Sequence, residues 1–189
     1  IVEMQLNGVL RSFIFDTGAS RTTLTGEICR ELGLDIVDSL KVTDANGNTT
    51  VYPLVGVESM QTTDNVFRFR SIHAMTLPEP SPFACFGVDG LIGSDLFRNL
   101  MLEIDGKAHT ITLMTAENES SVSLRNMARF TTAGMPVVTL TTGNGANLTC
   151  LFDTGCPHFL SLKRSDHDIL RNAGALTELT EGEQVGAIS

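Results

Sequence analysis

The stretches SFIFDTGAS at residues 12–20 and TCLFDTGCP at residues 149–157 decide how this chain is interpreted. Each is an apolar run that ends in Phe-Asp-Thr-Gly. A chain of this length should contain on the order of 0.04 Asp-Thr-Gly tripeptides by chance at average residue usage. Two Asp-Thr-Gly tripeptides, each preceded by a phenylalanine, therefore predict one active-site element that is used twice.

The residue types of the motif suit acid–base chemistry. Two carboxylates held close together cannot both ionise cheaply, so a pair formed by Asp16 and Asp153 would keep one proton at mildly acidic pH. One carboxyl group can then act as acid while the other acts as base. Glycine lets the backbone turn tightly and threonine offers a hydroxyl that locks the turn. A single Asp-Thr-Gly could equally be an ordinary β-turn after a strand. The presence of two copies makes this alternative less favoured than an active-site pair.

Composition excludes several other classes of protein. The 189 residues include 13 basic and 22 acidic side chains, which give a formal net charge of −9. This balance argues against nucleic acid or an anionic membrane surface as a partner. The chain is 42% hydrophobic but has no apolar stretch near 18 residues, so we expect a soluble globular protein without a transmembrane segment.

The cysteines indicate neither a disulfide scaffold nor a zinc site. Four are present, and none forms a CxxC pair. We expect each to be a small buried hydrophobic residue, and the sequence leaves their disulfide state open. They are Cys29, Cys85, Cys150 and Cys156.

Turn residues between short β-branched or aromatic runs predict an all-β architecture. The strongest local signal is Asn7-Gly8, which joins strands at residues 1–6 and 9–15 into a hairpin. The further predicted elements are a helix over 25–32, a hairpin over 41–52, a strand over 66–75, a strand that breaks at Gly93 into a helical turn containing Asp95, and a hairpin over 101–113. For Asp95 we expect a helix-capping role.

The order of hairpin, Asp-Thr-Gly and helix then starts again. Strands over 135–141 and 146–152 precede the second motif, and a helix over 165–172 follows it. We therefore predict a first lobe with a flap over 1–114, a linker over 115–134 and the front part of a second lobe over 135–189. This second lobe is expected to be incomplete, since no counterpart of the later first-lobe strands follows.

These residues resemble the retropepsin and pepsin group of aspartic peptidases, most closely the bacterial retropepsin-like proteins with two lobes in one chain. The similarity is carried by FDTGAS at 15–20, by the hairpin around Asn46-Gly47, and by GLIGSD at 90–95. It covers residues 1–113 and the front of a lobe over about 135–188. It implies an all-β acid-protease fold made of two related β-barrel lobes.

The resemblance also implies an aspartic endopeptidase that acts on a peptide or protein substrate without a metal or cofactor. A water held between Asp16 and Asp153 would attack the peptide carbonyl. Thr17 and Thr154 would brace the paired turns by crossing to the opposite strand, and Ser20 would bind the Asp16 carboxylate. The remaining implied site residues are Gly18 and Gly155 in the turns and Ala45, Asn46 and Gly47 in the substrate-covering flap.

The second motif departs from the first at Pro157, which stands where the first motif has Ser20. Proline has no hydroxyl and cannot form the corresponding hydrogen bond. We therefore expect Asp153 to be the carboxyl that first donates a proton, with Asp16 as the ionised partner.

Two alternatives stay open. The chain could be a peptide-binding pseudo-peptidase that has lost its chemistry, or a homodimer that pairs Asp16 with Asp16. A monomer with an intramolecular dyad is favoured over the homodimer. The substrate is left open, as is the cellular location, for which a secreted or bacterial cell-envelope protein is favoured.

Overall fold

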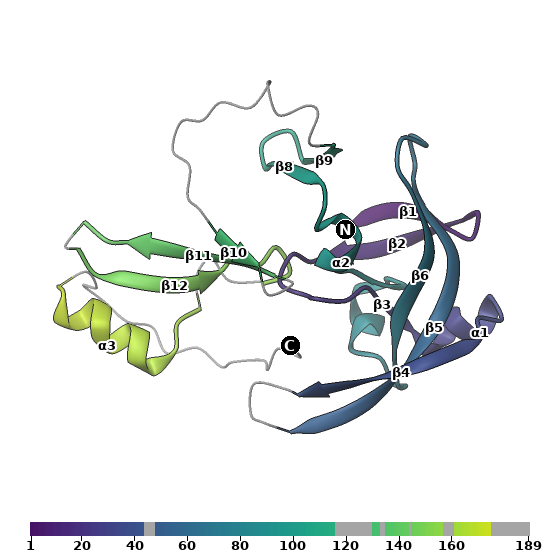
Figure 1. The fold of residues 1–189 in the computed structure, drawn as a ribbon, viewed down its shortest axis with the longest axis horizontal. Helices are drawn as coiled ribbons and strands as arrows, with labels where there is room; N and C mark the ends of the chain where they lie inside the picture. Colours follow the sequence, from purple (N-terminus) through teal and green to yellow (C-terminus); the bar gives the residue numbers. More distant parts are fainter. Residues whose placement is uncertain (44–47, 116–129, 133–134, 144, 157–160, 175–189) are drawn as a thin grey trace.

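The computed structural model describes residues 1–43, 48–115, 130–132, 135–143, 145–156 and 161–174 (Figure 1). The chain is mostly β. The strands are β1 (Val2–Leu6), β2 (Val9–Phe15), β3 (Thr23–Thr25), β4 (Ile36–Thr43), β5 (Thr49–Thr62), β6 (Arg68–Leu77), β7 (Gly90–Ile92), β8 (Met101–Asp105), β9 (Thr110–Met114), β10 (Phe130–Thr132), β11 (Pro136–Thr141) and β12 (Asn147–Leu151). The helices are α1 (Gly26–Glu31), α2 (Ser94–Phe97) and α3 (Arg164–Asn172), with a 3-10 turn at η1 (Pro82–Phe86).

Six strands close into a barrel. Their order is β1-β2-β7-β3-β6-β5, and β5 pairs back with β1, so the sheet has no free edge among these six. Strand β4 pairs with the outer part of β5 and extends the sheet beyond the barrel. This confirms the all-β barrel expected from the sequence. Two smaller sheets, β8-β9 and β10-β11-β12, are not hydrogen-bonded to the barrel strands (Figure 1). Leu102 of β8 and Leu113 of β9 pack against the barrel core.

The first hairpin forms as its turn residues predict. Leu6 pairs with Val9 in the antiparallel register of β1 and β2. Asn7 and Gly8 both have positive φ, at 49° and 84°, as a two-residue hairpin turn of type I′ requires. The alternation of β2 turns Phe13 and Phe15 into the core, and the strand ends directly at Asp16.

The main core cluster fills the barrel, and a second, smaller cluster consists of Leu54, Met75 and Leu77. The fully buried side chains of the main cluster include Leu6, Phe13, Leu24, Ile28 and Ile92, which come from five different elements. Helix α2 joins this core because the Phe97 ring stacks on Phe15 with their centroids 4.8 Å apart. The end of the strand that carries the first motif is therefore held in the core by α2.

Helix α1 forms where the capping residues of the sequence predict it. The Thr25 hydroxyl accepts a hydrogen bond from the Ile28 N–H at 3.3 Å, and Gly33 takes a left-handed φ of 60° after the helix. In the second half of the chain, β11, β12 and α3 repeat the predicted hairpin and helix, and Gly174 again has a left-handed φ.

Other predictions need correction. Strand β3 was missed because its three residues carry no periodic pattern and are fixed only by pairing with β6 and β7. The hairpin expected over 41–52 is longer, since its register continues to Ile36 opposite Val55. Of the four cysteines, all free thiols, only Cys29 is buried. Cys85 is exposed, and Cys150 and Cys156 are partly buried.

Several expectations concern residues outside the described ranges. These are most of the linker, the flap tip, Pro157 and the end of the chain after residue 174. Within the described ranges, no helix has the length and apolarity needed to span a membrane.

Candidate active site

The two Asp-Thr-Gly turns meet and are joined by four hydrogen bonds. The Thr17 hydroxyl donates to the Phe152 carbonyl at 2.7 Å, and the Thr154 hydroxyl donates to the Phe15 carbonyl at 2.8 Å. The Thr17 N–H donates to the Thr154 hydroxyl at 3.0 Å, and the Thr154 N–H donates to the Thr17 hydroxyl at 3.1 Å. The crossing contacts that the resemblance implied are thus present, and each motif braces the other.

The glycines of the motifs are required by this close approach. A Cβ atom on Gly18 would lie 2.6 Å from Asp153 Oδ1, and one on Gly155 would lie 2.6 Å from Asp16 Oδ2. Real Cβ atoms essentially never come this close to another heavy atom. Each glycine therefore leaves the space that the aspartate of the opposite motif occupies.

Both aspartates are oriented by backbone donors of their own turn. Asp16 Oδ1 accepts the N–H groups of Gly18 at 2.8 Å and Ala19 at 3.1 Å, and Asp153 Oδ1 accepts that of Gly155 at 2.8 Å. Ser20 is exposed, and the bonds formed by the described residues include none from it to Asp16. The Ala19 N–H supplies the second donor instead, because the turn is tight enough to aim it at the carboxylate.

The pKa of Asp16 is raised to about 6. Burial is the largest cause, followed by a hydrogen bond with the Asp153 side chain and the charge of Asp153. The N–H groups of Gly18 and Ala19 act in the opposite direction. These causes favour the protonated form of Asp16. Pro157 lies outside the described residues, so the expectation drawn from it, that Asp153 donates the first proton, stays a prediction that competes with a proton held on Asp16.

A partly buried carboxyl group joins α2 to the segment that follows the first motif. Asp95 Oδ1 accepts both the N–H and the hydroxyl of Thr22 at 2.8 Å, and the Gly93 N–H donates to the Thr22 hydroxyl at 3.2 Å. The Ser94 N–H donates to the Ala19 carbonyl at 2.8 Å. Asp95 is thus a link between distant segments and not the expected helix cap. Burial raises its pKa. No sequence signal singled out Thr22, because its partner is far along the chain.

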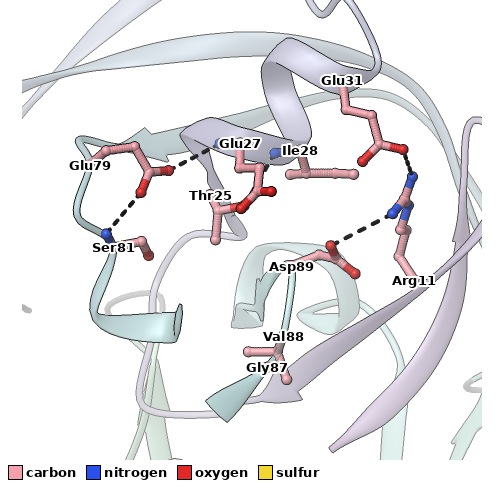
Figure 2. A pocket seen from close by; sticks show the side chains of 10 residues that line it. All are labelled: Arg11, Thr25, Glu27, Ile28, Glu31, Glu79, Ser81, Gly87, Val88 and Asp89. Carbon is pink, nitrogen blue, oxygen red and sulfur yellow. Dashed lines mark hydrogen bonds and ion pairs between the residues drawn. The ribbon is translucent and has the colours of Figure 1, made fainter. Parts of the chain in front are cut away.

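Figure 2 shows a pocket of about 300 Å³ beside α1. Its charged groups are largely satisfied within the protein. Glu79 accepts the N–H of Glu27 at 3.0 Å, at the start of α1, and Arg11 pairs with Glu31 and Asp89. None of the lining residues belongs to either motif. This pocket supports the helix start, and we do not place the active site there.

The flap residues Ala45, Asn46 and Gly47 lie outside the described residues, and so does Pro157. The strands that lead to the flap tip are described, and they pair up to Thr43 opposite Thr49. Over the residues that the structure describes, no group of three or more His, Cys, Asp or Glu side chains could hold a metal ion.

Of the comparisons with known proteins, the one with family models matches the part of the chain that carries the first motif. A family model described as aspartyl protease matches residues 2–96, which include Asp16 and the 90–95 stretch. Among solved structures, the chain is similar to a retropepsin-like aspartic protease from Rickettsia conorii. The identity is 22% and the TM-score 0.43, over 59% of this chain and 79% of that chain. No curated protein matches the chain.

Proposed function

Because this chain belongs to the aspartyl protease family, we propose that it is an aspartic endopeptidase whose catalytic carboxyl groups are those of Asp16 and Asp153. One observation carries the proposal. The glycine of each motif makes room for the aspartate of the other, and the two side chains are hydrogen-bonded. Two carboxyl groups in contact are the arrangement that general acid–base hydrolysis of a peptide needs.

The chemistry follows from the shared proton. At mildly acidic pH, Asp16 holds the proton and donates it to the oxygen of the peptide carbonyl. The Asp153 carboxyl group accepts a proton from a water molecule, whose oxygen attacks the carbonyl carbon. The tetrahedral intermediate then collapses as its C–N bond breaks. The proton on Asp153 passes to the departing amine nitrogen, and a hydroxyl proton of the intermediate returns to Asp16, which leaves a carboxylic acid and restores the dyad. Backbone N–H donors from Gly18, Ala19 and Gly155 keep the carboxyl groups in position during these steps.

We further propose that residues 1–114 and 135–189 act as two related lobes, joined by a linker over 115–134. We propose a monomer with an intramolecular dyad. The crossing hydrogen bonds of Thr17 and Thr154 join the first motif to the second, which supports a pair formed by Asp16 and Asp153. The substrate peptide would lie across the dyad beneath the hairpin of β4 and β5, whose tip carries Ala45, Asn46 and Gly47.

The test is cleavage of an unfolded protein substrate at about pH 5 by the wild type and by Asp16→Asn and Asp153→Asn. We expect both substitutions to lower kcat/KM by roughly 10³-fold or more, because residues that act as a unit are each needed. Circular dichroism melting of both variants controls for the fold.

Two outcomes would contradict the proposal. Full activity in Asp153→Asn, together with a dimeric mass in solution, would favour the pairing of Asp16 with Asp16. A wild-type protein that binds peptides without cleaving them would be a pseudo-peptidase.

A further inference from the structure

A second pocket, of about 360 Å³, lies where β6, the loop after the first motif and α2 come together. Three arginines from these three segments line it, namely Arg21, Arg70 and Arg98, and we call it the arginine pocket. His73 and Asp95 also line the arginine pocket.

The positive charge of the arginine pocket exceeds the negative charge in its lining, because three arginines face one carboxylate, that of Asp95, which interacts electrostatically with Arg21. All three arginines are exposed, and none forms an ion pair with another residue of the described part of the chain. The carboxylate in the lining, that of Asp95, already accepts two hydrogen bonds from Thr22 through one oxygen. In a protein with a formal net charge of −9, such a concentration of cations stands out. A cleft lined by one sign of charge focuses the field on a ligand of the opposite sign.

The arginine pocket is within reach of a peptide bound at the dyad. Arg21 follows Asp16 by five residues, so their Cα atoms are at most about 18 Å apart even for a fully extended chain. The turn closed by the Ala19 N–H on the Asp16 carbonyl makes the real separation shorter. An extended substrate therefore spans the gap with about five residues or fewer.

Where β6 lines the arginine pocket, it also lacks pairing with β3. Strand β3 pairs with β6 only from Met75 to Leu77, so the stretch from Arg70 to His73 has no β3 residue beside it. Ser71 in this stretch has a φ of 53°, a conformation that non-glycine residues adopt rarely. The pairing of β5 and β6 keeps one register on either side of it, with Ser59 opposite Arg70 and Val57 opposite Ile72.

We propose that the arginine pocket binds the side-chain carboxylate of an Asp or Glu in the peptide substrate, within about five residues of the cleaved bond. This inference rests on the proposed peptidase function and adds a substrate preference to it. The planar, permanently charged guanidinium groups of arginine match a carboxylate with two parallel hydrogen bonds, which favours an acidic side chain over its neutral amide.

The experiment uses peptides that differ only by Glu or Gln at one position, scanned over five residues on each side of the cleaved bond. At one position we expect the wild type to prefer Glu by about tenfold in kcat/KM, mainly through KM, as a remote binding contact should act. Each of Arg21→Gln, Arg70→Gln and Arg98→Gln should reduce the Glu/Gln ratio by about 2- to 5-fold, which is typical of exposed charge pairs. The triple variant should bring the ratio close to one.

The matched control is Arg30→Gln, which removes the same charge from an exposed residue of α1 that does not line this pocket. Its Glu/Gln ratio should equal that of the wild type. The preference of the wild type should also shrink between 50 and 500 mM salt, because exposed charges are screened.

A binding measurement separates this inference from the proposed function. Fluorescence anisotropy of the labelled Glu and Gln peptides with Asp16→Asn protein reports on the pocket without cleavage. The Glu peptide could bind in an arginine-dependent way while the wild type cleaves no substrate. That result would support the arginine-pocket inference and contradict the proposed peptidase function. Cleavage with a Glu/Gln ratio of one at every position would overturn the pocket alone. Displacement of the Glu peptide by low-millimolar inorganic phosphate, or by a short oligonucleotide at lower concentration than the peptide, would overturn the assignment to a peptide carboxylate.

Discussion

The first region of the molecule, residues 1–115, and the second, residues 130–174, carry the same motif in unequal surroundings. Phe15 is 9% exposed, whereas Phe152, at the same place in the second motif, is 51% exposed. All residues of the barrel core come from the first region, and the buried apolar side chains described in the second are Leu148 and Leu170. The contacts at the dyad are nevertheless matched pair by pair. Short-range geometry is thus set by the motif itself, while burial is set by what packs around it.

The core difference predicts the largest effect on stability. Leu24 in β3 is fully buried in the barrel core, and Leu148 in β12 is 6% exposed but belongs to neither core cluster. We expect Leu24→Ala to lower the free energy of unfolding by about 4 kcal/mol and Leu148→Ala by about 2 kcal/mol or less, within the range for this substitution. Urea denaturation of the whole protein, followed by circular dichroism, measures both. Equal losses would mean that the two regions share one cooperative core and would break the comparison.

The matched contacts at the dyad predict equal effects on activity. Gly18→Ala and Gly155→Ala each drive a Cβ atom into the opposite carboxyl group, so both should lower kcat by roughly 100-fold through misplacement of the dyad. The control is Gly106→Ala, whose Cβ would meet no heavy atom within 4 Å. A large loss in only one of the two motif variants would show that the symmetry of the contacts does not extend to function.

The crossing threonines should differ in their effect on stability although their bonds are equivalent. Thr17 is 1% exposed and Thr154 is exposed, so water can replace the lost bonds only at Thr154. Thr17→Val should reduce the free energy of unfolding by about 2–3 kcal/mol and Thr154→Val by about 1 kcal/mol. Thermal melting measures the loss, and Ser at either position should restore most of it. A larger loss at Thr154 would contradict this reading of burial.

The raised pKa of Asp16 predicts the smallest effect, and it depends on pH. A carboxyl whose pKa rises from 3.8 to about 6 on folding stabilises the protein below pH 4 and loses that contribution as the pH rises through 6. Asp16→Asn cannot titrate there. Its melting temperature should therefore rise relative to the wild type between pH 4 and pH 7, by the equivalent of about 1 kcal/mol, since solvent screens this partly exposed group. A constant difference across this range would show that Asp16 does not hold the proton of the pair.

The sequence alone determined what a few neighbouring residues encode. Asn7-Gly8 fixed the first hairpin, Thr25 and Gly33 bounded α1, and the repeated Asp-Thr-Gly indicated two turns that meet. Each of these signals acts through local backbone preference or a bond within one turn. They also led to the bracing role of Thr17 and Thr154, because the motif resembles a known one.

Only the tertiary structure decided the features that join distant segments. Strand β3 exists because β6 and β7 flank it, and Asp95 binds Thr22 across the fold. The N–H of Ala19, and not the hydroxyl of Ser20, reaches Asp16, and burial then raises the pKa of that carboxyl. Burial, pocket charge and partner choice depend on which side chains a whole fold brings together, and no short stretch of sequence carries that information.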